Sequence, residues 1–168
     1  NVGLRCLVLW NNAIGAGGAA GLAHGLAANS TLQILDLGGN AVGANLLALK
    51  DALIGNGGLH TLGLANAQLG EEGGVAMAEV LEGNRSLQRL DLRRNALGIA
   101  GLMAIHLAMK SNRAMLEVAL DGVGEGTLGD DAELQASFQA EIKAACARNA
   151  AAAGSPAALL DESGSVST

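Results

Sequence analysis

A glycine-rich turn is the first feature of the sequence that could carry chemistry. Residues 15–20 read Gly-Ala-Gly-Gly-Ala-Ala between a strand-like and a helix-like run, which fits the G-x-G-x-x-A turn of dinucleotide-binding folds. Asp36 follows about twenty residues later, where such folds place an acid that binds ribose. However, the same turn recurs along the chain without this glycine spacing, and Glu71 and Glu72 would face a phosphate in one copy. We therefore expect a repeated structural turn and no cofactor.

Carboxylates and histidines are the other candidates for catalysis. Asp36 and Asp91 fall at equivalent positions of two predicted strands with Gly63 between them, which would place them about 10 Å apart. Some glycosidases separate their carboxylates by nearly this distance, but a flat, open sheet offers no pocket that would keep one of them protonated. No metal-ligand spacing relates the three histidines, His24, His60 and His106. We predict that the protein is not an enzyme and has no metal site.

Composition bounds the class of protein. The 168 residues suffice for one domain, and 50% hydrophobic residues with only 1% aromatic residues predict an aliphatic core. The net charge of −6 argues against a nucleic-acid binder that depends on phosphate contacts. No apolar run approaches the roughly 18 residues of a membrane span. Cys6 and Cys146 lie far apart without metal-type spacing, so we expect an intracellular, cytoplasmic protein.

A repeat organises the chain. Strand-like segments begin at steps of 28, 27, 28 and 28 residues, from Leu4, Leu32, Leu59, Leu87 and Met115. The first four match L-x-x-L-x-L-x-x-N, the leucine-rich-repeat pattern. The asparagine is present as Asn12, Asn40 and Asn95, but Ala67 replaces it in the third unit. Because a buried Asn amide can bond the backbone of a tight turn, we expect a looser turn in that unit.

A helix pattern follows each turn, with apolar residues four apart. An asparagine closes each predicted helix, where Asn tolerates the left-handed conformation: Asn29, Asn56, Asn84 and Asn112. One strand and one full helix per unit predict an α/β leucine-rich-repeat solenoid of the ribonuclease-inhibitor-like subtype. In this horseshoe, parallel strands line the concave face and helices cover the convex face, and each unit contacts its neighbours.

The two ends of the solenoid differ in sequence. No amphipathic element precedes Leu4, so the first strand would have an open edge, and we expect that further repeats precede it. At the other end, a capping helix is predicted over about residues 130–148, with one apolar stripe: Leu134, Phe138, Ile142 and Cys146. The repeat domain thus spans residues 1–149. Residues 150–168 have low complexity and are expected to be disordered.

The concave face is the candidate binding surface. Outward positions predict three columns across the sheet: Cys6, Ile34, Thr61, Arg89, Glu117; Val8, Asp36, Gly63, Asp91, Ala119; and Trp10, Gly38, Ala65, Arg93, Asp121. Trp and Arg are common interface anchors. The candidate partner-binding residues are therefore Trp10, Asp36, Arg89, Asp91, Arg93 and Arg94. Alternatively, Trp10 packs against a preceding repeat.

Charges within the columns predict two ion pairs. Arg89 should face Glu117 and Arg93 should face Asp121, each one strand away, at about 4.8 Å across the sheet. Such exposed pairs contribute little free energy. Arg94 faces Gly122 and is expected to have no acidic partner, which leaves it available to a protein partner.

The last repeats suggest a family through two stretches: EEGGVAMAEVLEGNRSLQRLDLRRNALGIAGLMAIHLAMKSNRAMLEVALD from Glu71 and AEIKAACARNAAAA from Ala140. They resemble the C-terminal repeats and capping helix of the leucine-rich-repeat regulatory subunits of protein phosphatase 1 (the regulatory subunit 37 family). The resemblance covers roughly Leu59–Asn149. It implies a non-catalytic protein that binds the phosphatase catalytic subunit and inhibits it.

One feature of phosphatase-1 partners is absent from the sequence. Their short basic-Val-x-Phe docking motif does not occur, and the only Phe, Phe138, stands in ASFQA. No phosphatase-binding residue can therefore be assigned by resemblance. Two other classes stay open: a sensor or inhibitor module of the NOD-like or ribonuclease-inhibitor type, and a GTPase-activating protein of the Ran type. The latter would need a catalytic arginine or a long acidic tail, and neither is evident.

Overall fold

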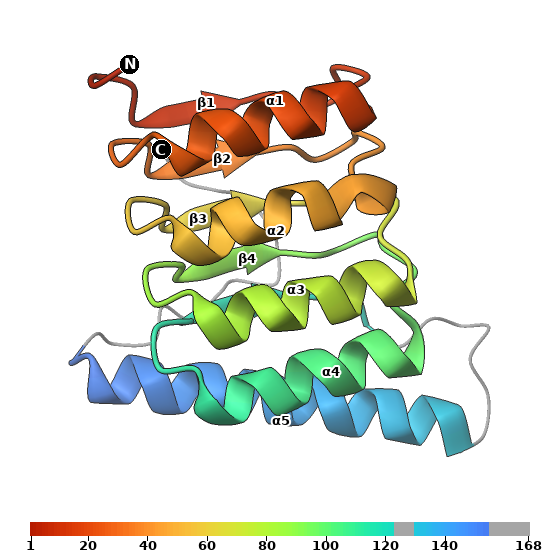
Figure 1. The fold of residues 1–168 in the computed structure, drawn as a ribbon. Coiled ribbons are helices and arrows are strands. Elements are labelled where there is room, and N and C mark those ends of the chain that lie inside the picture. Colours follow the sequence, from red (N-terminus) through yellow and green to blue (C-terminus); the bar gives the residue numbers. More distant parts are fainter. Residues whose placement is uncertain (123–129, 155–168) are drawn as a thin grey trace.

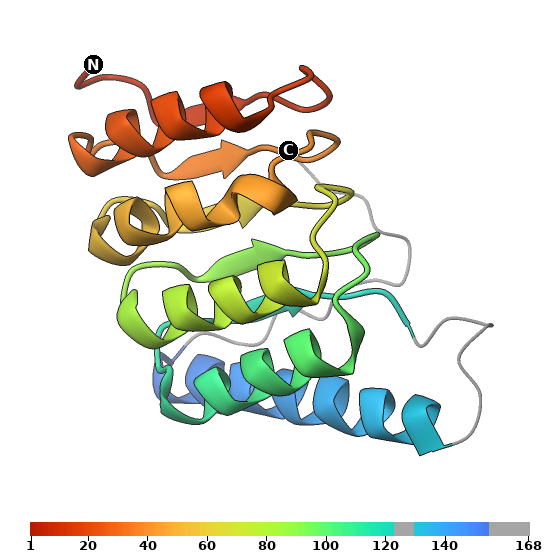
Figure 2. The same ribbon diagram turned by 45° about the vertical axis from the view of Figure 1, so that its right-hand side comes forward.

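The chain folds into a leucine-rich-repeat solenoid, as the repeat predicts. The computed structural model describes residues 1–122 and 130–154. Each of the first four units is a three-residue strand, a turn and a helix, and the fifth has a three-residue strand and the helix from Asp130. The strands form one parallel sheet in the order β1-β2-β3-β4-β5, and the helices stack as a layer along one face of it (Figures 1 and 2). The open face of the sheet is the concave face.

The elements follow one another with short strands and longer helices. They are β1 (Cys6–Val8), α1 (Ala16–Ala27), β2 (Ile34–Asp36), the 3-10 helix η1 (Gly43–Asn45), α2 (Leu46–Gly55), β3 (Thr61–Gly63), α3 (Glu71–Gly83), β4 (Arg89–Asp91), α4 (Gly98–Ser111), β5 (Glu117–Ala119) and α5 (Asp130–Ala152).

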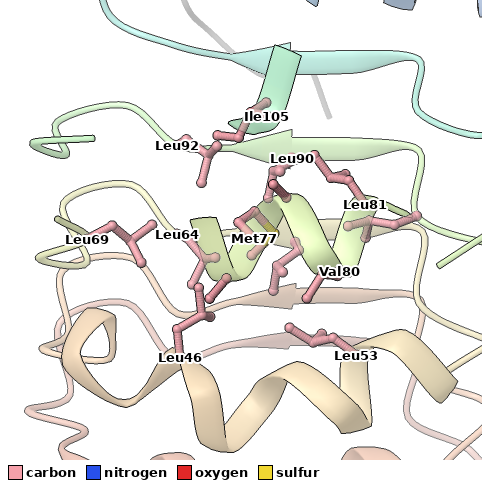
Figure 3. Packing of buried hydrophobic residues seen from close by; sticks show 14 of the residues in the cluster. Leu46, Leu53, Leu64, Leu69, Met77, Val80, Leu81, Leu90, Leu92 and Ile105 are labelled. Atoms are coloured by element: carbon pink, nitrogen blue, oxygen red, sulfur yellow. The ribbon is translucent and has the colours of Figure 1, made fainter. Parts of the chain in front are cut away.

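The core lies between the sheet and the helices. Because side chains alternate along a strand, the central Leu35, Leu62 and Leu90 point toward the helices and are at most 2% exposed. Met77 of α3 and Ile105 of α4 belong to the same core on the helix side and are fully buried (Figure 3). The aliphatic core expected from the composition is thus built from the repeated leucines.

Asparagines join the helix ends of successive repeats. The amide Nδ2 of Asn84 donates to the carbonyl oxygens of Leu53 (2.7 Å) and Asn56 (2.9 Å) in the preceding repeat. Its Oδ1 accepts the backbone N–H groups of Ser86 (2.8 Å) and Leu87 (2.7 Å). Asn56 and Asn112 make the same kinds of bond.

The reason for asparagine at these positions differs from the predicted one. Asn56, Asn84 and Asn112 have φ between −68° and −81° and extended ψ, so none of them adopts the left-handed conformation. These residues are instead only 1–6% exposed. Their side-chain amides donate hydrogen bonds to backbone carbonyl groups that the helix ends leave unpaired. The asparagine is selected for four hydrogen bonds and not for backbone freedom.

A second series of asparagines supports the turns. Asn95 Oδ1 accepts the N–H groups of Ala67 and Leu69, both at 3.0 Å, from the preceding repeat. The expectation of a looser third turn is therefore wrong, because the third turn depends on the asparagine of the fourth repeat and not on residue 67 itself. Asn40 gives the first turn the same support.

The substitution at Ala67 acts on the second repeat. There the Val42 N–H donates to the Asn40 carbonyl (2.9 Å), and the Gly43 N–H donates to the Ala67 carbonyl (2.8 Å). The 3-10 helix η1 follows before α2 begins. The second repeat, which is one residue short, thus has a turn that lacks an asparagine from its neighbour.

Helix α5 covers the C-terminal end of the stack beside α4 (Figure 1). Within the predicted stripe, Ile142 and Cys146 are buried and Phe138 is half-buried, but Leu134 is 42% exposed. The helix ends at Ala152 and not near residue 148. Residues 150–152, predicted to be disordered, are therefore helical. Residues 123–129 and residues 155–168 of the predicted tail lie outside the described residues.

Candidate protein-binding surface on the concave face

The strand register aligns the predicted columns. Cys6, Ile34, Thr61, Arg89 and Glu117 pair in one row across the sheet, and Val8, Asp36, Gly63, Asp91 and Ala119 in another. The third column lies just beyond the strand ends. All five repeats therefore contribute to one continuous surface on the face that the helices leave open.

Apolar side chains occupy the N-terminal half of this surface. Trp10 is 45% exposed, Val8 is 60% exposed and Ile34 is 40% exposed. A Cβ atom at Gly38 would overlap the six-membered ring of Trp10, so the indole lies against the backbone of the second repeat. Trp10 therefore packs on the second repeat, and the absence of a side chain at Gly38 leaves room for its ring.

Small residues separate this half from the charged one. Gly38, Gly63 and Ala65 lie between the apolar residues and the fourth repeat. A Cβ atom at Gly63 would meet the carboxylate of Asp36, whose Oδ1 accepts the Gly38 N–H at 2.9 Å. The middle of the concave face therefore has only small side chains that do not project from the sheet. Asp36 lies beside them, fixed by its hydrogen bond with Gly38.

The fourth repeat carries a forked ion pair. Arg93 donates from Nε to Asp91 Oδ1 (3.0 Å) and from Nη2 to Asp91 Oδ2 (2.6 Å), and its backbone N–H also donates to Oδ1 at 3.0 Å. The hydrogen bonds that Arg93 donates to Asp91 are the main cause that raises the pKa of Arg93 above its ordinary value. The guanidinium is therefore fixed in place and charged.

One predicted ion pair is present and the other is wrong. Arg89 Nε lies 3.6 Å from Glu117 Oε2, as the column predicts. Arg93 pairs with Asp91 of its own repeat and not with Asp121. Asp91 lies two positions before Arg93 in the sequence, so both of its carboxylate oxygens can accept from the guanidinium group. The carboxylate of Asp121 instead accepts the backbone N–H of Arg94.

Arg94 occupies a strained backbone position. Its φ of +58° lies in the left-handed region, where the equivalent residues of the first three repeats are Asn11, Gly39 and Asn66. Asn and Gly tolerate that region far better than Arg does. Asp121 stabilises this turn by accepting the backbone N–H of Arg94, while the Arg94 side chain is exposed.

The structure separates the six predicted residues into two groups. Trp10 and Asp36 lie on the first two repeats, and the other four, Arg89, Asp91, Arg93 and Arg94, lie on the fourth. The candidate set omitted Val8 and Ile34, which complete the apolar group. Their signal was available in the sequence, since both occupy outward columns that carry charges in the fourth repeat.

The histidines, cysteines and carboxylates do not form a metal site in the described part of the chain. In residues 1–122 and 130–154, no group of His, Cys, Asp and Glu could hold a metal ion. His106 of α4 is buried and stacks on Phe138 of α5, with ring centroids 5.5 Å apart. Burial raises the pKa of Cys146 to about 11, which fits an apolar packing role.

Comparison with known proteins agrees with this architecture. Residues 28–45 and 83–105 match the family model described as Leucine Rich repeat. No curated protein sequence matches the chain significantly. No helix in the described ranges is long and apolar enough to cross a membrane.

Two solved structures share the fold. Actin-binding site 2 (ABS2) of leiomodin-1 has a TM-score of 0.75 and 18% identity, over 89% of this chain and 83% of that one. The C-terminal domain of tropomodulin from Caenorhabditis elegans has a TM-score of 0.73 and 14% identity, over 92% of this chain and 89% of that one. The chain thus has a leucine-rich-repeat fold, which typically serves as a non-catalytic module for protein interactions.

Proposed function

We propose that the protein is a non-catalytic scaffold whose concave face binds a partner protein, and that it acts in the cytoplasm as an inhibitory regulatory subunit of protein phosphatase 1. The exposure of Trp10 beside the sheet is the observation that carries the first half of this proposal. Aromatic residues and arginines are enriched among the residues that dominate interface energies. Contiguous apolar side chains on a surface mark interaction sites.

The two groups on the face fit an extended partner segment. An apolar side chain of the partner would pack on Trp10, Val8 and Ile34, and a polar one would reach the Arg93–Asp91 pair. Gly63 and Ala65, between the two groups, have no side chain that would block the surface, so one segment of the partner could cross from one group to the other. The apolar contacts would supply affinity, while the paired charges would fix orientation.

Sequence resemblance supports the choice of the phosphatase. The repeats and capping helix from Leu59 to Asn149 resemble those of its leucine-rich-repeat regulatory subunits. Units of 27–28 residues with one full helix each support the ribonuclease-inhibitor-like subtype. Phe138 is half-buried beside His106 and cannot act as a docking phenylalanine, so a basic-Val-x-Phe motif would have to lie outside this chain.

A binding titration with the catalytic subunit of protein phosphatase 1 tests the proposal. Trp10→Ala should weaken binding at least tenfold, as expected for an aromatic residue that anchors an interface. Arg94→Glu should also weaken binding. Leu47→Ala is a matched control, because Leu47 is an apolar residue of α2 in the helix layer that is 65% exposed.

The outcomes separate the two halves of the proposal. Absence of phosphatase binding to the folded protein would rule out the regulatory subunit. Binding that Leu47→Ala weakens as much as Trp10→Ala would place the partner away from the concave face. Circular dichroism of each variant checks that the fold is retained.

Actin is a second candidate partner, because one structural neighbour is named for an actin-binding site. An identity of 18% carries the fold and no binding residue. The same titration with actin in place of the phosphatase separates the candidates. Actin binding that depends on Trp10, without phosphatase binding, would transfer the proposed function to actin.

A further inference from the structure

The outer surface of the helix layer carries a row of exposed apolar side chains. Leu47 of α2 is 65% exposed, Val75 of α3 is 41% exposed and Met103 of α4 is 45% exposed, and Ala20 of α1 is exposed as well. Each lies at the same place in its repeat, 16 residues after the leucine that starts it, or 15 in the second repeat, which is one residue short. Surface helices normally turn polar residues outward. We call these four residues the apolar row.

Close packing of the helices makes the apolar row continuous. Helices α1 to α4 lie side by side, so the row crosses their axes (Figure 1). A Cβ atom at Gly74 would lie 2.7 Å from the Cα atom of Gly101, which shows how closely α3 and α4 approach. Because packed helices are about 8–10 Å apart, the row measures roughly 25–30 Å. Leu107 of α4, 50% exposed, widens it one turn after Met103.

Acidic side chains surround the middle of the apolar row. Helices α2 and α3 contain one basic residue, Lys50, and five acidic ones: Asp51, Glu71, Glu72, Glu79 and Glu82. Lys50 Nζ lies 2.5 Å from Glu79 Oε2 and joins the two helices. Among the described residues, no cation lies within ion-pair distance of Asp51, Glu72 or Glu82. Leu47 and Val75 therefore lie in negatively charged surroundings.

We propose that the apolar row binds a basic amphipathic helix of a partner protein, which lies across α1 to α4 on the convex face. A helix rises 1.5 Å per residue, so apolar residues seven apart recur about every 10.5 Å, close to the spacing of the row. An extended strand covers that distance in about three residues, which would turn alternate side chains away from the row. Lysines or arginines beside the apolar positions would face the carboxylates.

The charges disfavour a second copy of the chain as the occupant. A two-fold axis would place the same surface on both sides of the interface. The carboxylates of Asp51, Glu72 and Glu82 in one copy would then lie near those of the other, and like charges across an interface repel. A partner of opposite charge removes this repulsion, and its site is separate from the concave face.

A synthetic Leu–Lys peptide of about 21 residues, or three heptads, tests the site. It has Leu at the first and fifth positions of each heptad, Lys beside them and Ala elsewhere. In fluorescence anisotropy with the full chain it should bind saturably, and circular dichroism should show its helicity rise. A scrambled peptide of the same composition and a peptide with a central Pro should bind at least tenfold more weakly, because neither forms the apolar helix face.

Variants of the chain locate the peptide. Leu47→Ser combined with Val75→Ser should weaken binding about tenfold, because two apolar contacts are lost. Val8→Ser is the matched control, since Val8 is 60% exposed on the concave face, and it should leave binding unchanged. Asp51→Asn combined with Glu72→Gln should weaken binding about threefold at low salt and less at high salt. All these residues are exposed, and circular dichroism checks that each variant folds.

Four results would overturn the proposal. They are the absence of saturable binding, equal binding of the scrambled or Pro-containing peptide, and an equal loss with Val8→Ser. The fourth is sedimentation of the chain as a dimer that Leu47→Ser dissociates, since the row would then bind a second copy. Loss of peptide binding in the Leu47 and Val75 variant, with phosphatase binding retained, would show that the two faces bind separate partners.

Discussion

At the C-terminal end of the stack, α5 supplies the bonds that another repeat would make. Arg148 Nη2 donates to the carbonyls of Met109 (3.0 Å) and Asn112 (3.2 Å), and Asn149 Nδ2 donates to those of Asn112 (3.1 Å) and Met115 (2.8 Å). At the N-terminal end, Asn29 Nδ2 donates to a single carbonyl, that of Asn1.

The same repeat sequence therefore meets two different environments. Met115 begins the last unit and is fully buried, whereas Leu4 begins the first and is 41% exposed. A repeat cannot bury its apolar side alone, so its stability comes from its neighbours. The position of a leucine or asparagine in the stack, more than its residue type, therefore determines how much it contributes to the stability of the fold.

Removing a strand leucine gives the largest expected contrast between the ends. Leu90→Ala should cost about 2–5 kcal/mol of unfolding free energy, because Leu90 is 2% exposed and the cavity cannot refill. Leu7→Ala, in the same register row, should cost about 1 kcal/mol or less, since Leu7 borders an open groove between β1 and α1. Chemical denaturation measures both, and equal costs would contradict the comparison.

Removing a turn asparagine should have the next largest effect. Asn95→Ala leaves the Leu64 and Leu92 carbonyls and two turn N–H groups without partners, which should cost about 1–3 kcal/mol. Asn12→Ala, the same change in the first repeat, should cost about 0.5 kcal/mol or less. Among the described residues no donor reaches Asn12 Oδ1, so a larger loss for Asn12 in urea titrations would be incompatible with an unused Oδ1.

The two thiols should differ in reactivity and in pH dependence. Cys6 on β1 is exposed, whereas Cys146 in α5 is buried with a pKa raised to about 11. At pH 8 a thiol reagent should label Cys6 quickly and Cys146 only after unfolding. Equal labelling rates in the native protein would show that α5 does not shield its end.

The same pKa shift predicts a loss of stability in alkali. In the folded protein Cys146 keeps its proton up to about pH 11, while the unfolded thiol loses it near pH 9. The unfolded state therefore binds fewer protons in this window, so the unfolding free energy should fall by on the order of 1–2 kcal/mol as the pH rises through it. Cys146→Ala should abolish this part of the decline, and an unchanged pH profile would contradict the burial.

The exposed ion pair should have the smallest effect. Arg89 and Glu117 are 3.6 Å apart with side chains 63% and 33% exposed. Arg89→Gln should therefore change the unfolding free energy by about 0.5 kcal/mol or less, and less still in high salt. A cost that exceeds the cost of Leu7→Ala would reverse the expected order.

Periodicity was enough to predict the fold. The spacing of Leu32, Leu59 and Leu87 predicts strand starts and register, because a parallel solenoid places equivalent positions side by side. The strand columns on the concave face follow from the same alternation. Trp10, Arg89 and Asp91 therefore lie where the sequence predicts.

Contacts between repeats were harder to predict. The repeat pattern marks Asn95 but does not say that its carboxamide supports the previous turn, so the effect of Ala67 was assigned to the wrong unit. Arg93 could reach Asp91 or Asp121, and the choice depends on side-chain geometry at the strand end. Such choices are fixed by packing in three dimensions and leave no periodic signal.

Native-state hydrogen exchange tests the central claim that the two ends of the stack differ. Amide protection should rise from Leu4–Leu9 of the first repeat to Arg89–Asp91 of β4 and should stay high through β5, because α5 closes that end. The opening free energy of the β1 segment should be well below that of global unfolding. Protection of β1 equal to that of β4 would contradict the account.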